Sequence, residues 1–467
     1  MDSYETLLAA ITAEGGRPVT DPATGEVIGH APVHTAADLD AAVARAQAAQ
    51  PAWAALSDDE RIATLNRVAD AIEASSEALA HLLSREQGKP LNGPNARFEV
   101  GACVSWLRAT AATALPFEVV VDDGDTYAEL HYRPVGLVGA ITPWNWPMMI
   151  AIWQLAPALR MGNAVVAKPS EYTTLSGLAL IAVMNEVLPE GVLNVVTGAG
   201  DIGGAMVANP AFGKIMFTGS TATGKKIIEG SAGNVTRLTL ELGGNDAGIV
   251  LPDVDPAAIA EDLFWGAFIN TGQTCAALKR LYVHDSIYDE VVSALSDVAA
   301  KMPMGVGLSE DNVLGPLQNR MQFDVVDRLV ESAKASGARV VLGGEPDRDA
   351  VGNFYPTTLV ADIDPHNDLV VEEQFGPALP IIRYRDVDEA VALANGIDAG
   401  LGASVWSADR DQARALAARL EAGTVWINSH GGVHPFIPFG GVKKSGYGLE
   451  FGVEGLKAVS VPQVING

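Results

Sequence analysis

The chain has 467 residues, with 57 acidic and 31 basic side chains and a formal net charge of −26. Hydrophobic residues make up 48 % and charged residues 19 %, which excludes a disordered chain and allows a large core. The negative charge argues against nucleic acids and anionic membranes as partners, because phosphate groups are bound by clustered Lys and Arg. At roughly 150 residues per domain, the length allows about three domains.

Two features of the sequence predict a cytoplasmic location. The first residues lack the basic segment and apolar core of a secretory signal, and no apolar run approaches the roughly 18 residues of a membrane span. Two cysteines, Cys103 and Cys275, are too few for a disulfide scaffold. We therefore expect free thiols in a reducing compartment.

The first third of the chain predicts helices followed by a hairpin. Apolar residues recur at helical spacing over 37–55 and 58–84, and the second segment stops before Gly88. Residues 117–133 then form two short segments around Asp123-Gly124, a turn signal typical of a β-hairpin. Such a hairpin is either an arm at an interface or an ordinary surface hairpin.

Strand and helix patterns alternate through the rest of the chain. This alternation predicts βαβ units and a mostly parallel, doubly wound sheet, whose ligands bind at the carboxyl ends of the strands. A boundary between two such regions falls near Gly243-Gly244. The first region has expected strands at 137–142, 164–168, 193–197, 214–217, 237–242 and 247–251 and helices at 175–188 and 224–228; the second has a helix before Cys275, helices at 288–301 and 387–394, and strands at 339–342 and 424–427.

Three weaker patterns do not predict the sites that their spacing suggests. Residues 198–203 (GAGDIG) fit G-x-G-x-x-G, but the acidic residue of such a dinucleotide site is missing roughly 20 positions further on. Residues 219–225 fit a P-loop, but Lys226 stands where Ser or Thr binds magnesium. Both are interpreted as tight turns. His430 and His434 are surrounded by glycines and a proline, so we predict no metal site.

Two residues are candidates for chemistry. Cys275 follows a small polar segment (NTGQT), where backbone amides can lower the pKa of a thiol and make it a nucleophile, although a lone Cys is often a buried hydrophobe. Glu241 ends an apolar strand, so we expect a half-buried carboxylate with the raised pKa of a general base; the alternative is a salt-bridged Glu. Cys103 lies in an apolar segment and is interpreted as a core residue.

Several motifs together, in this order along the chain, resemble those of the aldehyde dehydrogenase superfamily. The segment FINTGQTC (268–275) is similar to the nucleophile motif and LELGGN (240–245) to the general-base motif, and the separation of Glu241 and Cys275 matches as well. The other matches are PWNWP (143–147) for the oxyanion, KPSE (168–171) and FTGS (217–220) for the cofactor, EEQFGP (372–377) for the nicotinamide side, and PFGGVKKSG (438–446) for the carboxyl-terminal signature.

The resemblance implies an α/β fold of the aldehyde dehydrogenase type. Residues 1–115 and 135–243 would form a modified Rossmann cofactor domain and 244–440 an α/β catalytic domain. The hairpin at 116–134 and the tail at 453–467 would form an oligomerisation arm, with the tail adding a strand across subunits. A homodimer or homotetramer is therefore expected.

The resemblance also implies the roles of individual residues. Cys275 would attack an aldehyde, Asn145 and the Cys275 backbone N–H would hold the oxyanion, and Glu241 would activate water. NAD is the expected cofactor, with NADP possible, because Glu171 would accept a ribose hydroxyl and repel an extra phosphate. The implied cofactor residues are Thr142, Trp144, Lys168, Ser170, Glu171, Gly219, Ser220, Gly243, Glu373 and Phe375, and the implied substrate residues are Trp146, Ile150, Trp153, Thr274 and Phe439.

The substrate and the rival activities stay open at this point. The implied tunnel residues are mainly apolar, which favours an aliphatic or aromatic aldehyde over a carboxylated semialdehyde. A relative that passes the acyl group to coenzyme A usually lacks the general base, so Glu241 argues against that class. A cofactor-free cysteine hydrolase would need a His partner for Cys275, and no motif supplies one. A catalytically silent member of the family is the remaining alternative.

Overall fold

The amino-terminal part of the chain is mainly helical. The computed structural model describes residues 3–467. Thr35 and Ser57 begin two of the helices with capping boxes, which satisfy the first free N–H groups. The predicted helix over 58–84 is two helices, because the backbone leaves helical geometry at Ser75 (φ −98°, ψ 9°). The elements are α1 (Tyr4–Ile11), β1 (Arg17–Thr20), β2 (Val27–Ala31), α2 (Ala36–Ala55), α3 (Asp58–Ala74), α4 (Ser76–Gln87) and α5 (Ala96–Ala112).

A six-stranded sheet follows, in the order β19-β9-β8-β5-β6-β7. All of its pairs are parallel except β19 with β9 at one edge. Strands β5, β6 and β8 are buried along their whole length, as parallel strands covered on both faces are. The predicted parallel sheet is confirmed. Its elements are β5 (Leu137–Ile141), α6 (Pro147–Arg160), β6 (Ala164–Lys168), α7 (Thr174–Asn185), β7 (Leu193–Val195), α8 (Gly200–Ala208), β8 (Lys214–Thr218), α9 (Thr221–Ser231), β9 (Arg237–Glu241) and β19 (Gly446–Tyr447).

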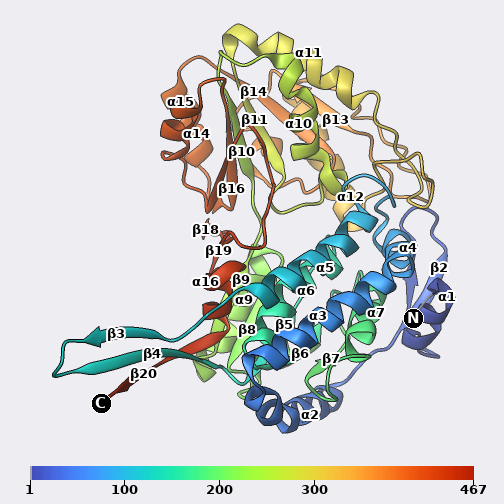
Figure 1. The fold of residues 1–467 in the computed structure, drawn as a ribbon. Helices are drawn as coiled ribbons and strands as arrows, with labels where there is room; N and C mark the ends of the chain where they lie inside the picture. Colours follow the sequence, from blue (N-terminus) through green and yellow to red (C-terminus); the bar gives the residue numbers. More distant parts are fainter. Residues whose placement is uncertain (1–2) are drawn as a thin grey trace.

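A second sheet of seven strands has the order β12-β13-β14-β11-β10-β16-β17 and is parallel except for β12 with β13. In Figure 1 this sheet lies in the upper part of the molecule, and the first sheet lies in the lower part. The expected boundary near Gly243-Gly244 falls between β9 of the first sheet and β10 of the second. The elements are β10 (Asp246–Val250), α10 (Pro256–Phe268), β11 (Leu278–His284), α11 (Tyr288–Ala299), α12 (Arg320–Ala335), β12 (Arg339–Leu342), β13 (Thr358–Ala361), α13 (Asp368–Val371), β14 (Ala378–Tyr384), α14 (Val387–Asn395), β16 (Gly402–Trp406), α15 (Arg410–Ala417) and β17 (Thr424–Ile427).

The predicted hairpin projects from the body of the molecule (Figure 1). It consists of β3 (Glu118–Asp122) and β4 (Tyr127–Pro134), and the tail follows α16 (Gly452–Ala458) as β20 (Ser460–Asn466). The tail pairs antiparallel with β4 of its own chain, from Ser460 opposite Pro134 to Asn466 opposite Ala128. The tail is thus an edge strand beside β4 of its own chain, and the expectation that it adds a strand across subunits stays a prediction. The domain limits stay predictions.

Short elements complete the chain: a two-stranded sheet of β15 (Ala399–Gly400) and β18 (Val442–Lys443), and the 3₁₀ turns η1 (Ala232–Asn234), η2 (Ile269–Gly272) and η3 (Asp285–Ile287). The helix that the sequence predicts before Cys275 is α10, and the 3₁₀ turn η2 lies between this helix and Cys275. Among residues 3–467, no helix is both long enough and apolar enough to cross a membrane.

Candidate active site

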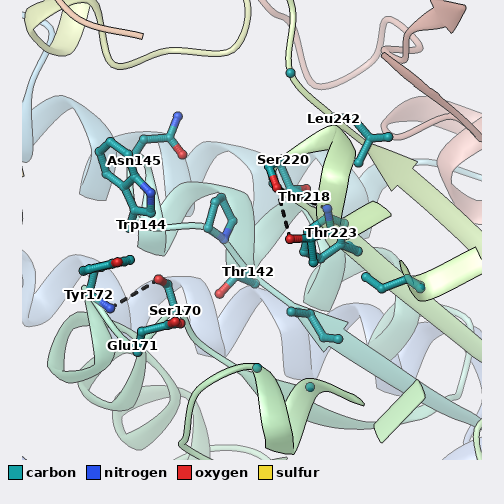
Figure 2. Close-up of a pocket in the computed structure, with 18 of the residues that line it drawn as sticks. Thr142, Trp144, Asn145, Ser170, Glu171, Tyr172, Thr218, Ser220, Thr223 and Leu242 are labelled. Atoms are coloured by element: carbon teal, nitrogen blue, oxygen red, sulfur yellow. Dashed lines mark hydrogen bonds between the residues drawn. The ribbon is translucent and has the colours of Figure 1, made fainter. Parts of the chain in front are cut away.

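A cavity of 830 Å³ lies at the carboxyl ends of the parallel strands of the first sheet. Asn145 and Cys275 both line it, so two of the three residues with expected catalytic roles share one wall. Figure 2 shows the part of the wall formed by the loops after these strands. The ten residues with expected cofactor roles also line it: Thr142, Trp144, Lys168, Ser170, Glu171, Gly219, Ser220, Gly243, Glu373 and Phe375.

The amino terminus of α9 faces this cavity. Ser220 caps the helix by accepting a hydrogen bond from the Thr223 N–H at 3.3 Å, and Ser220, Thr223 and Gly219 all line the wall (Figure 2). Free N–H groups and the helix dipole make such a terminus suitable for a phosphate group. The structure therefore offers an anion site where the resemblance implies one.

The glycines of α8 form the opposite part of the wall. Gly200, Gly203 and Gly204 line the cavity, and a Cβ at Gly200 or Gly204 would meet no neighbouring atom within 4 Å. The interpretation of residues 198–203 as only a tight turn is therefore incomplete. Because these glycines have no side chains, they leave space in the cavity for a ligand. The G-x-G spacing directly after a strand was the signal that could have identified these residues.

Lys168 and Glu171 lie at the end of β6 and in the loop after it. The Lys168 side chain is buried, which lowers its pKa, while the nearby Glu171 carboxylate acts in the opposite direction. Tyr172 lies beside Glu171 on the wall and was missed by the sequence analysis (Figure 2). Across the cavity Met321, whose side chain is exposed, lines the wall from α12, in a segment for which the sequence predicted no role.

Three consecutive left-handed residues precede Cys275. Asn270 (φ 50°), Thr271 (φ 57°) and Gly272 (φ 76°) have positive φ, which is rare for a β-branched residue such as Thr271. The Thr271 hydroxyl donates to the Gly315 carbonyl at 3.3 Å and accepts from the Gly315 N–H at 3.0 Å. A Cβ at Gly272 would collide with the backbone of Gly376. Neighbouring segments thus hold this loop in a conformation that it would not adopt alone.

Hydrogen bonds hold Asn145 through both its side-chain amide and its backbone carbonyl. Its side-chain N–H donates to the Gln273 carbonyl at 3.0 Å, two residues before Cys275. Its own carbonyl accepts from the Asn270 side chain and from Lys89 Nζ, each at 2.8 Å. The side-chain amide of Asn145 therefore lies next to the loop that precedes Cys275.

The Cys275 thiol is half-buried and surrounded by carboxylates. Its pKa is raised to about 12, chiefly by desolvation and also by Glu241, Asp246 and Glu373, while Lys279 acts in the opposite direction. The other cysteine, Cys103, is buried in the core as expected. Both cysteines are free thiols.

Glu241 is more deeply buried than the sequence suggested. It is 4 % exposed rather than half-buried, and it is absent from the cavity wall. One carboxylate oxygen has no hydrogen-bond partner, so the salt-bridged alternative does not apply. Burial raises the pKa of Glu241 well above its usual range, and the buried carboxylate of Glu450 adds to this shift. Glu450, which lies between β19 and α16, was missed by the sequence analysis.

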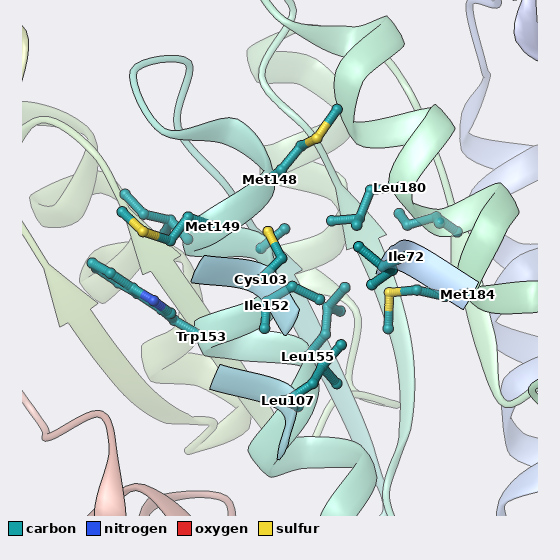
Figure 3. Close-up of a cluster of buried hydrophobic side chains, with 14 of the residues drawn as sticks. Ile72, Cys103, Leu107, Met148, Met149, Ile152, Trp153, Leu155, Leu180 and Met184 are labelled. Atoms are coloured by element: carbon teal, nitrogen blue, oxygen red, sulfur yellow. The ribbon is translucent and has the colours of Figure 1, made fainter. Parts of the chain in front are cut away.

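The five residues with expected substrate roles lie behind the cavity rather than on its wall. Trp146 is held by an indole N–H bond of 2.9 Å to the Thr274 hydroxyl. Trp153 packs edge-on against Phe451 at 4.8 Å between ring centres, and Phe439 stacks on Phe451 at 6.0 Å. Ile150 is buried in the same core, part of which Figure 3 shows around Met149 and Trp153. Cys275 packs against this core, so its surroundings on that side are apolar and aromatic.

Comparison with known proteins decides the family. The family model described as the aldehyde dehydrogenase family matches residues 11–465. The chain belongs to the aldehyde dehydrogenase family. It is similar to the geranial dehydrogenase of Castellaniella defragrans (40 % identical, 94 % of this chain and 93 % of that one) and to the phenylacetaldehyde dehydrogenase of Pseudomonas fluorescens (38 % identical, 94 % and 90 %).

Solved structures agree with this assignment. A putative aldehyde dehydrogenase from Burkholderia cenocepacia has a TM-score of 0.93 and is 39 % identical, covering 96 % of this chain and 93 % of its own. The betaine aldehyde dehydrogenase of Staphylococcus aureus, solved with NAD⁺, has a TM-score of 0.92 at 33 % identity, covering 98 % and 92 %. An NADP-dependent enzyme from E. coli has a TM-score of 0.93 at 34 % identity, covering 96 % and 94 %. The chain is thus an NAD(P)-dependent aldehyde dehydrogenase with the family fold.

The strained nucleophile loop of this aldehyde dehydrogenase gives a first prediction. Thr271→Val keeps the shape of the side chain but removes the two hydrogen bonds to Gly315, which leaves a buried N–H and C=O unpaired at a cost of about 1–3 kcal/mol. We expect a lower melting temperature and a lower kcat. Thr64→Val is the matched control, because the Thr64 hydroxyl bonds only within its own helix. Equal melting temperatures of Thr271→Val and wild type would contradict this account of the loop.

Proposed function

We propose that the protein oxidises an apolar aliphatic or aromatic aldehyde to the carboxylic acid, with NAD as the cofactor. The observation that carries this proposal is the shared wall of the 830 Å³ cavity, which brings Cys275 and Asn145 together with the ten residues expected to bind the cofactor. The apolar and aromatic core behind Cys275 supports the choice of substrate class.

The cavity fits a dinucleotide. The capped amino terminus of α9 and the bare glycines of α8 suit a pyrophosphate, and Glu171 is available to a ribose hydroxyl. On the other side, the ring of Phe375 packs edge-on against Trp144 at 5.4 Å, next to Glu373. When bound there, the cofactor supplies the acceptor for the hydride that leaves the substrate. A carboxylate at Glu171 favours NAD over NADP, because it repels a 2′-phosphate.

The protein's own residues carry the remaining chemistry. The Cys275 thiolate attacks the aldehyde carbon, and the Asn145 amide with the Cys275 N–H stabilises the oxyanion; one such donor is typically worth about 2.7–4 kcal/mol in the transition state. Oxidation leaves a thioester on Cys275. Glu241 then takes a proton from water, which releases the acid. This role requires the Glu241 side chain to turn from its buried position toward the cavity.

The class of substrate is supported by relatives and by charge. The two relatives named above are called geranial and phenylacetaldehyde dehydrogenases, whose substrates are a terpenoid and an aromatic aldehyde. The five implied substrate residues carry no charge, so none of them would bind a second carboxylate. We also propose a cytoplasmic location, which the two free thiols Cys103 and Cys275 support.

A panel of aldehydes tests the proposed function. Reduction of NAD should depend on Cys275, proceed fastest with aromatic and terpenoid aldehydes, and show a lower KM for NAD than for NADP. Cys275→Ala is the control that separates enzymatic from background reduction. A low KM for succinic semialdehyde would contradict the proposed substrate class, and a preference for NADP would contradict the role of Glu171.

The role of Glu241 has its own test. Glu241→Gln should still form the thioester and release one burst of reduced cofactor per active site, because attack and oxidation do not use the carboxylate. Steady turnover should fall by about 10²–10⁴-fold, the usual contribution of general base catalysis. Rapid-mixing absorbance measurements distinguish the burst from the steady phase. Undiminished steady turnover would rule out Glu241 as the base.

We propose that the arm of β3, β4 and β20 joins copies of the chain into a homodimer or homotetramer. Val119, Val120 and Phe117 on the hairpin and Val464 on the tail are exposed apolar residues, each more than half exposed. Val120→Asp should shift the mass in solution toward the monomer, because a charge at an apolar contact is costly. Light scattering measures this mass, and a monomeric wild type at micromolar concentration would refute the proposal.

A further inference from the structure

Lys279 lies next to the loop that carries Cys275. It is the second residue of β11, its side chain is 2 % exposed, and its Nζ donates to the Cys275 carbonyl at 2.5 Å. The same ammonium forms an ion pair with Glu373 Oε1 at 3.0 Å. One lysine therefore joins the loop that carries the thiol to the loop that carries a residue of the cavity wall. From the sequence alone its direction was unknown.

Because Lys279 is buried, its ammonium group depends on partners inside the protein. Removing an ammonium group from water costs several kcal/mol unless it is paired and hydrogen-bonded. The partners of Lys279 Nζ are the Cys275 carbonyl and Glu373, and the ring of Phe375 lies 5.7 Å from the ammonium. All three are parts of the proposed active site. A core lysine with only a structural task would not need to meet them.

Glu373 is held in place from two sides. Lys279 contacts one carboxylate oxygen, and the other packs against Gly243, where a Cβ would collide with it. Gly243 and Glu373 both line the cavity. Lys279 thus determines how close the Glu373 carboxylate lies to the Cys275 loop.

The charges that face the Cys275 thiol make Lys279 important for its ionisation. Glu241, Asp246 and Glu373 all disfavour the thiolate, and Lys279 is the cation that opposes them. Loss of the ammonium would leave the acidic side chains that face the thiol without this compensation. Neutralising Glu373 instead would favour the thiolate.

We propose that Lys279 is a positioning residue that couples the cavity residue Glu373 to the Cys275 loop, so that it both stabilises the Cys275 thiolate and orders Glu373 for the ribose on the nicotinamide side. This inference rests on the proposed function for the role of Glu373. The proposed stabilisation of the Cys275 thiolate concerns Cys275 alone, and it can be tested without measuring turnover.

The first test measures alkylation of Cys275 by iodoacetamide between pH 7 and pH 10, with the modified cysteine identified by mass spectrometry. Lys279→Met should slow alkylation about tenfold at each pH, which corresponds to a rise of one pKa unit. Lys279→Arg should keep most of the wild-type rate, because it retains the charge. Glu373→Gln should accelerate alkylation. The double variant should fall between the two single variants.

The second test measures binding of NAD by calorimetry and the KM for NAD and for the aldehyde. Lys279→Met should weaken NAD binding and raise the KM for NAD, with little change in the KM for the aldehyde. Lys334→Met is the control, since Lys334 is paired with Glu331 and Glu345, does not line the cavity and is not among the charges that face Cys275. It should leave the pH dependence of alkylation unchanged.

The outcomes separate the two proposals. Unchanged alkylation and NAD binding in Lys279→Met would overturn the role of Lys279, even if the enzyme oxidises aldehydes as proposed. Shifted alkylation and NAD binding in a protein that reduces no cofactor with any aldehyde would support Lys279 and refute the proposed function. If Lys279→Met does not fold, Lys279→Arg and Glu373→Gln decide the matter, because only the second should accelerate alkylation.

Discussion

The left-handed turn formed by Asn270, Thr271 and Gly272 is the constraint on which the site depends. Left-handed backbone at residues other than glycine costs about 1–3 kcal/mol each, so the turn persists only because other segments hold it. The Gly315 backbone binds the Thr271 hydroxyl, the backbone of Gly376 leaves no room for a side chain at Gly272, and the Asn145 carbonyl accepts from the Asn270 amide. Because these segments come from distant parts of the chain, Cys275 reaches its position only when the whole fold has formed.

A buried ion pair extends this constraint to the amino-terminal helices. Lys89 and Glu99 are both fully buried and lie 2.6 Å apart, and Lys89 also donates to the Asn145 carbonyl. The other oxygen of Glu99 accepts from the first free N–H groups of α6, at Met148 and Met149. One carboxylate thus satisfies a helix terminus and a lysine that would each be costly to leave unpaired. The segment around Asn145 is therefore fixed between this ion pair and the loop that precedes Cys275.

Strand and helix alternation predicted the parallel sheet, and the resemblance of short motifs to those of the family implied ten residues that line the cavity wall. Strand alternation locates the carboxyl ends, and short motifs such as that around Lys168 stay contiguous in the fold. What the sequence could not predict depends on packing between distant segments. The burial of Glu241 comes from the segment around Glu450, the tail pairs with β4 of its own chain, and Trp153 meets an aromatic cluster completed by Phe451. A lysine's direction, as at Lys279, is likewise decided by partners that lie far away in the chain.

The charged groups around Cys275 explain why its thiol is unreactive in the resting protein. In the resting geometry desolvation and the neighbouring acidic side chains favour the neutral thiol, and Lys279 opposes them. A neutral thiol is a poor nucleophile and a poor target for oxidation. Any event that engages Glu373 or turns Glu241 toward the cavity changes the same set of charges. The groups that would contact the cofactor and the water, Glu373 and Glu241, also influence the ionisation of Cys275. Cofactor binding and a movement of Glu241 would therefore both change the pKa of the thiol.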